Sequence, residues 1–239
     1  MENCTDKWVI DIVRRGYCIE FQEFPLPTGT RITRVGSQDE MEILRKECQA
    51  LLEKQDIEPV PVNQRGLGFY SRFFLRPKKT GDLRPILNLR PLNKCLKVQK
   101  FRMDSVNVVV RAVRQGDWAV SLDLKDAYLH VPIWFGHKQY LRFALGPHEH
   151  YQFLCLCFGL STAPRTFTKV VVALGALLRM YMIRIYQYLD DWIIVGKNRR
   201  DVMKARDLVI KLTQEAGFRS EERRVWEVGG GGGGGGGWG

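Results

Sequence analysis

Two adjacent carboxylates, Asp190 and Asp191, stand between two runs of β-branched and aromatic residues. The run before them (183–188) and the run after them (192–195) each favour a β-strand, so the sequence predicts a hairpin with both acids at or beside its turn. Aspartate is an ordinary turn residue, but tight hairpin turns usually contain glycine, and this one has none. Because two like charges side by side repel unless a cation lies between them, the pair indicates a hard divalent cation such as magnesium. Such a site needs a third carboxylate.

The candidate third carboxylate is Asp123. Residues 118–123 predict a strand that ends in this acid, ahead of a short turn or helix closed by Pro132. Backbone amides exposed after a strand end could receive a triphosphate. An acid in this position is also a common helix cap, and the residues by themselves leave both roles open.

A second set of residues suited to phosphate chemistry is basic. Residues 69–75 and 83–89 predict a hairpin whose turn carries Lys78 and Lys79, with Arg84 just beyond it. Lysine-rich tips commonly serve solubility. The alternative is a movable basic flap over phosphates, in which arginine offers a two-pronged fork and lysine a point charge.

Three amphipathic helices are expected beside these strands. One over 38–55 begins at a capping box, a second is capped by Ser161 or Thr162 with Pro164 in its first turn, and a third is capped by Asn198. In the second helix, Arg165 and Lys169 lie four residues apart. We expect them to share an exposed face that suits a phosphate backbone.

The composition limits the class of partner. The 239 residues include 37 Lys and Arg against 26 Asp and Glu, a net charge of +11, which indicates a polyanionic partner, nucleic acid before membrane. The polar, acidic start predicts no signal peptide, and the longest apolar run, 170–178, is too short to span a bilayer. Six cysteines without a dense framework predict reduced thiols in an intracellular protein, with cytoplasm and nucleus both open.

A zinc site is the weaker interpretation of one cluster. His148, His150, Cys155 and Cys157 are close in the sequence, but their spacing is not a usual finger pattern and the chain has no Cys-x-x-Cys pair. In a strand, the two cysteines would share one face. Burial of the thiols is therefore the preferred interpretation.

Both ends of the chain are predicted to lie outside the fold. Residues 1–37 are predicted to be a loosely structured lead-in segment that precedes the folded domain. Residues 219–228 are charged and without a clear period, and nine glycines follow over 229–237. We expect 219–239 to be a low-complexity, disordered tail, and it suggests a truncation or an assembly scar.

Three stretches stand in the order and spacing of motifs A, B and C of reverse transcriptases. They are Leu-Asp-Leu-Lys-Asp-Ala-Tyr at 122–128, Phe-Gly-Leu-Ser-Thr-Ala-Pro at 158–164 and Tyr-Leu-Asp-Asp at 188–191. Residues 84–93 resemble the fingers motif that precedes these three. Over 38–218 the chain resembles retrotransposon polymerases, most of all those of DIRS-type or related long-terminal-repeat elements.

The resemblance implies an α+β fold of fingers and palm, with an antiparallel palm sheet backed by helices. The fingers would comprise 38–102 and 133–157, and the palm 103–132 and 158–218. Two positions depart from the family pattern: Asn88 stands where an acid is common, and Cys157 where a proline usually precedes motif B. Neither departure removes a metal ligand.

The resemblance also implies roles for individual residues. The metal ligands would be Asp123, Asp190, Asp191 and the backbone carbonyl of Leu124, holding two magnesium ions, or manganese in their place. The positions that match contacts to the incoming nucleotide are Lys78, Arg84, Asp126, Ala127, Tyr128, Phe158 and Gly159. Among these, Tyr128 matches the steric gate that favours deoxynucleotides. Tyr188 matches a contact to the primer–template.

The activity implied is reverse transcription: template-directed transfer of deoxynucleotides to a primer 3′-hydroxyl, on RNA or DNA, by two metal ions. No membrane partner is expected. Nothing after Phe218 resembles a thumb or a ribonuclease H domain, which a longer polyprotein could supply. One alternative is therefore a catalytically incompetent nucleic-acid-binding remnant. A ribonuclease H activity is a more distant one, because its acids would need a separate domain.

Overall fold

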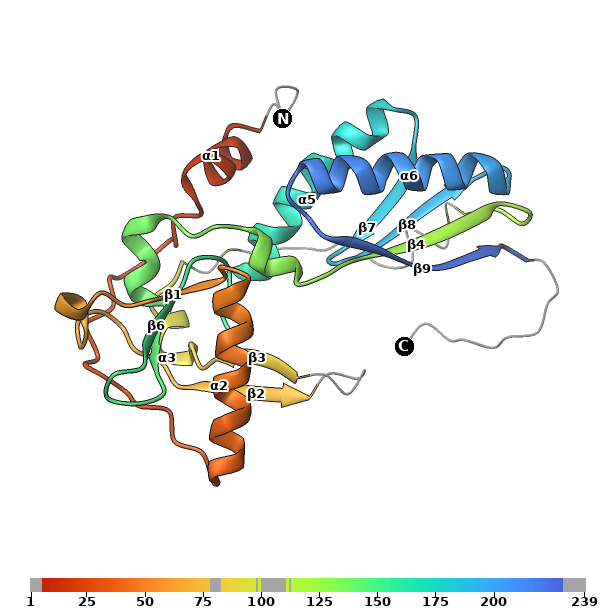
Figure 1. The fold of residues 1–239 in the computed structure, drawn as a ribbon. Coiled ribbons are helices and arrows are strands. Elements are labelled where there is room, and N and C mark those ends of the chain that lie inside the picture. Colours follow the sequence, from red (N-terminus) through yellow and green to blue (C-terminus); the bar gives the residue numbers. More distant parts are fainter. Residues whose placement is uncertain (1–5, 78–82, 98, 100–110, 112, 230–239) are drawn as a thin grey trace. The chain divides into compact units, whose positions relative to one another are not determined.

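The structure is a computed structural model that describes residues 6–77, 83–97, 99, 111 and 113–229. Its helices and antiparallel sheets form an α+β fold, as the sequence predicts (Figure 1). Within the described residues, no helix combines the length and the apolar character needed to cross a membrane.

The chain divides into two compact units. Unit 1 comprises residues 1–5, 102–127 and 168–239, and unit 2 comprises 6–101 and 128–167. From residue 6 onward, the chain therefore passes from unit 2 to unit 1, back to unit 2, and once more to unit 1. The predicted boundaries of fingers and palm stay a prediction.

Unit 1 is built on a four-stranded antiparallel sheet in the order β7-β8-β4-β9. The strands are β4 (Trp118–Leu124), β7 (Arg184–Tyr188), β8 (Asp191–Gly196) and β9 (Ser220–Glu227). Helix α6 (Arg199–Glu215) packs across β4, β8 and β9 (Figure 1). The side chain of Asn198 caps α6 by accepting a hydrogen bond from the Asp201 amide at 2.9 Å, which explains why the helix begins there.

The two faces of this sheet differ because side chains alternate along each strand. Val120 and Leu122 of β4 are fully buried and stand opposite Ile194 and Trp192 of β8. The other face carries a cluster of Ala119, Ile193 and Val195, packed against further apolar residues that include Trp226 of β9. By the same alternation and register, Asp123 and Asp191 lie on this second face.

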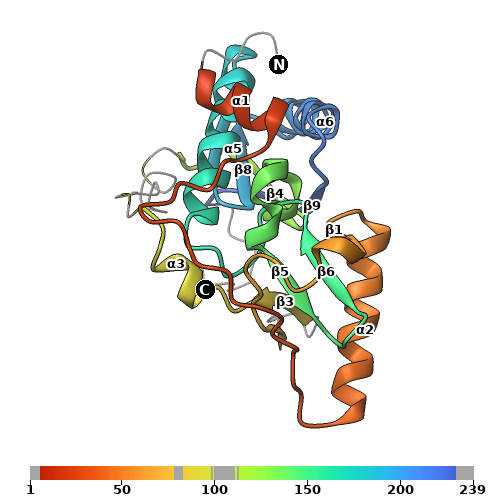
Figure 2. The ribbon, with the colours of Figure 1, turned by 90° about the vertical axis from the view of Figure 1, so that its left-hand side faces the viewer.

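Unit 2 contains a three-stranded antiparallel sheet in the order β1-β6-β5 and a separate hairpin of β2 and β3. Helix α2 (Gln38–Glu53) packs against β1 and runs alongside this sheet (Figure 2). The strands are β1 (Ile57–Pro59), β2 (Phe73–Pro77), β3 (Leu83–Leu87), β5 (Arg142–Ala144) and β6 (His150–Phe153). The short helices are α1 (Lys7–Arg15), η1 (Val62–Gln64), α3 (Arg90–Asn93) and η3 (Phe135–Tyr140). Helix η2 (Ala127–His130) begins at the last residue of a unit 1 segment and continues in unit 2. Helix α5 (Ala163–Met180) begins in unit 2 and continues in unit 1.

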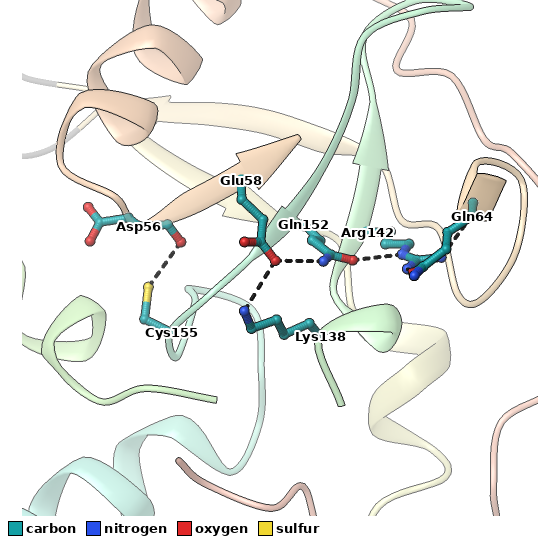
Figure 3. A network of polar contacts seen from close by, with 7 residues as sticks. All are labelled: Asp56, Glu58, Gln64, Lys138, Arg142, Gln152 and Cys155. Atoms are coloured by element: carbon teal, nitrogen blue, oxygen red, sulfur yellow. Dashed lines mark hydrogen bonds and ion pairs between the residues drawn. The ribbon is translucent and has the colours of Figure 1, made fainter. Parts of the chain in front are cut away.

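A buried polar network fixes the three-stranded sheet of unit 2 (Figure 3). The Arg142 side chain is 2% exposed and donates from Nε to Gln152 Oε1 at 2.9 Å and from Nη2 to Gln64 Oε1 at 2.6 Å. Gln152 donates in turn to Glu58 Oε1 at 2.8 Å, and Lys138 Nζ reaches the same oxygen at 3.1 Å. Burial lowers the pKa of Arg142. Neutral oxygens accept the hydrogen bonds of the Arg142 guanidinium, and the side-chain amide of Gln152 lies between Arg142 and the Glu58 carboxylate.

Two expectations about the ends of the chain are wrong in part. Within the predicted lead-in, α1 forms with Asp6 as its cap and buries Val9 and Ile12. The apolar residues of α1 span too few turns for a helical periodicity to be recognised in the sequence. Within the predicted tail, residues 220–227 form β9, a charged edge strand whose burial does not alternate regularly. The glycines from 230 onward lie outside the described residues.

Candidate active site

The hairpin predicted around the paired acids is formed by β7 and β8. Tyr188 pairs with Asp191, so Leu189 and Asp190 make a two-residue turn. Without glycine, the turn places Leu189 at φ 52°, a left-handed conformation that costs a bulky residue about 1–2 kcal/mol. Two hydrogen bonds hold it: the Trp192 indole donates to the Leu189 carbonyl at 3.1 Å, and the Leu124 amide donates to the Asp190 carbonyl at 2.8 Å. The second bond fastens the turn to the end of β4.

Asp123 and Asp191 face each other across β4 and β8, where they are register partners. A single guanidinium bridges them: Arg223 Nη2 lies 2.8 Å from Asp123 Oδ1, and Arg223 Nη1 lies 3.1 Å from Asp191 Oδ1. The Asp123 side chain is 17% exposed and that of Asp191 is 58% exposed. Two carboxylates on neighbouring strands therefore share one positive charge.

The charge around Asp191 favours a bound cation. Burial raises the pKa of this carboxyl above its usual range, and the negative charges of Asp190 and Asp123 raise it further. Arg223 acts in the opposite direction. An additional cation at this position would stabilise the ionised form in the same way.

The donors fit a divalent cation, although the complete predicted cluster is not assembled. Among the described residues, no group of three or more His, Cys, Asp and Glu side chains is close enough to hold a metal ion. The guanidinium nevertheless shows that Asp123 and Asp191 converge on one cation. Carboxylate oxygens are the ligands that magnesium prefers. The structure thus brings together two of the three acids that the sequence predicts.

In unit 2, three residues predicted to line the incoming nucleotide occur together. The ring centroid of Tyr128 lies 5.0 Å from that of Phe158 and 5.6 Å from that of Phe167. Gly159 follows Phe158 with φ +113°, and a Cβ atom there would stand 2.0 Å from the Leu87 carbonyl oxygen. The Phe158 carbonyl accepts from the Leu87 amide at 3.0 Å. Motif B is thereby held against the end of β3, where only glycine fits.

The other predicted nucleotide contacts are less fully described. Asp126 has a left-handed φ of 51°, and Ala127 is buried at the start of η2. Arg84 lies in β3 opposite Arg76, but its side chain is outside the described residues. Lys78 lies outside them entirely. The roles of these residues stay predictions.

The expectation that Arg165 lies on an open face is wrong. Its side chain is 17% exposed, lies 3.6 Å from Glu20 and stands over the Trp8 ring at 5.6 Å. These partners come from a segment about 150 residues earlier, and the helical spacing of Arg165 and Lys169 carries no sign of them. Lys169 is half-buried, whereas Tyr188 is exposed. Their contacts with a primer–template stay predictions.

The cysteines proposed for burial are buried. Cys155 is 4% exposed and its thiol donates to the Asp56 carbonyl at 3.3 Å (Figure 3). Burial raises the pKa of Cys157 to about 12, so this thiol stays protonated. His150 is engaged by the Tyr70 hydroxyl at 2.9 Å. The preferred interpretation, structural thiols, is confirmed.

The sequence did not reveal two basic features. Arg223 belongs to the stretch predicted to be a tail, and only its strand and register bring it to the acids. The second is a cavity of about 580 Å³ in unit 2, lined by residues that include Arg31, Arg34 and Arg72. Ser71 also lines it, and the hydroxyl of this buried residue has no hydrogen-bond partner among the residues that the structure describes. Arg72 is remote in the sequence from Arg31 and Arg34, so no local pattern marks the cavity.

Comparison with known proteins identifies the family. Residues 76–223 match the family model for "Reverse transcriptase (RNA-dependent DNA polymerase)". This match covers more than half of the 239 residues, and the chain belongs to the reverse transcriptase family.

Relatives among curated proteins are retrotransposon polyproteins. The Transposon Tf2-3 polyprotein of Schizosaccharomyces pombe is 25% identical over 206 residues, which cover 85% of this chain and 14% of that protein. The Tf2-7 polyprotein of the same organism is 24% identical over 206 residues, which again cover 85% of this chain and 14% of that protein. The chain thus spans about 14% of the length of these relatives. The finer assignment to DIRS-type elements stays a prediction.

A solved structure shares the fold. The protease–reverse transcriptase of prototype foamy virus superposes with a TM-score of 0.67 at 18% sequence identity, over 86% of this chain and 26% of that one. This likeness supports the α+β architecture of fingers and palm.

Proposed function

We propose that this chain carries out template-directed DNA synthesis, transferring deoxynucleotides to a primer 3′-hydroxyl on an RNA or DNA template. The observation that carries the proposal is the pair Asp123 and Asp191, which face each other around one cation in a member of the reverse transcriptase family. Asp190, one residue before Asp191, and the carbonyl of Leu124 complete the proposed ligands for two magnesium ions. When bound, these ions would acidify the primer hydroxyl and neutralise the leaving pyrophosphate.

The chain's own residues position the nucleotide. The Tyr128 ring, packed against Phe158 and Phe167, acts as a rigid wall that crowds a 2′-hydroxyl. Gly159 lets motif B lie close to β3, which holds Phe158 beside the Tyr128 ring. The amides of Asp126 and Ala127 receive the triphosphate, and Lys78 and Arg84 neutralise it. These groups supply orientation and charge stabilisation and need no covalent intermediate.

Basic groups hold the nucleic acid. The net charge of +11 favours a polyanion, and the arginine-lined cavity of unit 2 offers three guanidinium groups to its phosphates. Tyr188 and Lys169 contact the primer–template. Phosphate contacts of this kind position the strand without reading its sequence.

A second candidate is nucleic-acid binding without synthesis. It is favoured by the absence, among the described residues, of a three-acid group that could hold a metal. In this case the basic surface would still bind nucleic acid, and the acids would remain neutralised by Arg223.

Primer extension distinguishes the two candidates. The assay uses an RNA template, a DNA primer, deoxynucleotides and magnesium, and compares the wild-type chain with Asp191→Asn. Removing one essential charge should lower the rate by about a hundredfold or more. Glu215→Gln is the matched control, since it removes an exposed acid whose partner, Lys211, lies 4.0 Å away. Incorporation that Asp191→Asn leaves unchanged would refute synthesis at this site, and salt-sensitive binding without any incorporation would favour the second candidate.

A further inference from the structure

Arg223 extends from an irregularity in β9. Ser121 of β4 pairs with Arg224 and Leu122 pairs with Glu222, so Arg223 is the extra residue of a β-bulge. A bulge sets two residues of one strand against one of its neighbour and redirects a side chain out of the regular alternation. The bulge therefore decides where the Arg223 guanidinium points.

The acidic neighbours of Arg223 on β9 are engaged elsewhere. Glu221 lies 2.5 Å from Lys125 Nζ, and Glu222 forms an ion pair with Arg206 of α6. Each of these two acids thus has its own cation. Arg223 is directed instead to the two acids of the candidate active site.

We propose that Arg223 is an internal counter-cation that competes with divalent metal for Asp123 and Asp191, an inference that rests on the proposed function. The guanidinium bonds one oxygen of each acid, and these two carboxylates are the groups that would hold a divalent cation. A metal ion and the guanidinium exclude each other from these oxygens. The site therefore binds metal only after Arg223 has moved away.

The exchange is feasible because Arg223 is not locked in place. Its side chain is 56% exposed, so it can turn into solvent when a metal ion binds Asp123 and Asp191. Exposed ion pairs of this kind are weak, and a divalent cation bound by several carboxylates replaces them readily. Without metal, Arg223 relieves the repulsion between acids on adjacent strands and keeps β4, β8 and β9 together.

The first test measures divalent-cation affinity directly, without turnover. Manganese binding to the full chain is followed by electron paramagnetic resonance for the wild type, Arg223→Gln, and the control Arg224→Gln. Arg224 is the neighbouring arginine of β9, and its guanidinium stands 6.0 Å over the Trp226 ring. Arg223→Gln should bind manganese about three- to tenfold more tightly, because weak ion pairs no longer oppose it. Arg224→Gln should match the wild type.

Asp191→Asn separates this inference from the proposed function. If manganese binds the wild type and is lost in Asp191→Asn, the metal site exists, and equal or weaker binding by Arg223→Gln overturns the role of Arg223 alone. If no manganese binding depends on Asp191, the metal site itself is refuted and both proposals fall.

A second measurement follows the wild-type chain itself, and a variant serves only to assign one resonance. The Arg223 Nε–H resonance of the wild-type chain, assigned by its loss in Arg223→Lys, is followed by NMR during titration with magnesium. We expect it to move to the position of a solvated arginine as the site fills. A resonance that stays unchanged at saturating magnesium would overturn the competition.

Discussion

Replacing Gly159 by alanine should be among the most damaging small changes in unit 2. The new Cβ would stand 2.0 Å from the Leu87 carbonyl oxygen, where real contacts are not shorter than 3.0 Å, so the loop must shift by about 1 Å. That shift breaks or strains the bonds from the Leu87 amide to the Phe158 carbonyl and from Asn93 Nδ2 to the Gly159 carbonyl. Two bonds at about 1 kcal/mol each, with backbone strain of about 1–3 kcal/mol, give a loss of about 3–5 kcal/mol.

Gly29→Ala is the matched control, because Gly29 also has a positive φ, +66°, but apart from its chain neighbours no atom of the described residues lies within 4 Å of the position that its new Cβ would occupy. It should lose only the conformational part, about 1–2 kcal/mol. Urea denaturation of both variants gives the difference, and nucleotide affinity should fall only in Gly159→Ala. Equal losses in the two variants, with unchanged nucleotide affinity, would show that the close approach of motif B to β3 is not a constraint.

Three further perturbations follow from other contacts. Asp117→Asn should lower the free energy of unfolding by about 1 kcal/mol at neutral pH, because the backbone amide of Arg114 and the side chain of Arg184 lower the pKa of Asp117 below 3.8. Urea denaturation across pH should show this contribution above pH 3.8 and lose it as the pH falls through the lowered pKa of the folded state. A stability difference between the two proteins that does not change with pH would refute the linkage. Arg142→Met should destabilise unit 2 by about 3 kcal/mol in thermal or urea unfolding, since it leaves the buried Gln152 amide oxygen and part-buried oxygens of Gln64 and Leu67 without donors, and a neutral effect would contradict the network. The double change Arg31→Gln and Arg34→Gln should weaken binding to single-stranded RNA and reduce the slope of its salt dependence by up to about 2, whereas an unchanged slope would exclude the cavity as a phosphate site.

Local pattern was sufficient for the elements whose residues act as neighbours in the sequence. The hairpin around Asp190 and Asp191 follows from two β-prone runs, and α2 begins at the predicted cap, where the Ser37 hydroxyl accepts from the Glu40 amide at 3.2 Å. The end of a predicted strand made Asp123 a candidate third carboxylate, but only the resemblance to reverse transcriptases placed it with Asp191 in one metal site. Spacing along the chain does not specify which strands become neighbours.

What escaped prediction depends on register and on distant partners. The strand β9 is charged and lies at a sheet edge, so it lacks the alternation that marks a half-buried strand. The bulge that directs Arg223 is a property of two strands together and leaves no mark in either. Arg165 was misjudged for a related reason, since Trp8 and Glu20 cover it from a segment remote in the sequence.

The alignment of β4 with β8 has a consequence for which sequence changes the site can survive. Main-chain bonds hold Asp123 opposite Asp191 and tie Leu124 to the turn, so many side chains along both strands can change without moving the acids. A single inserted or deleted residue in either strand is different in kind. It would set Asp123 against Asp190 or Trp192 and turn one acid to the opposite face of the sheet. The site therefore tolerates substitutions along β4 and β8 but not an insertion or a deletion in either strand.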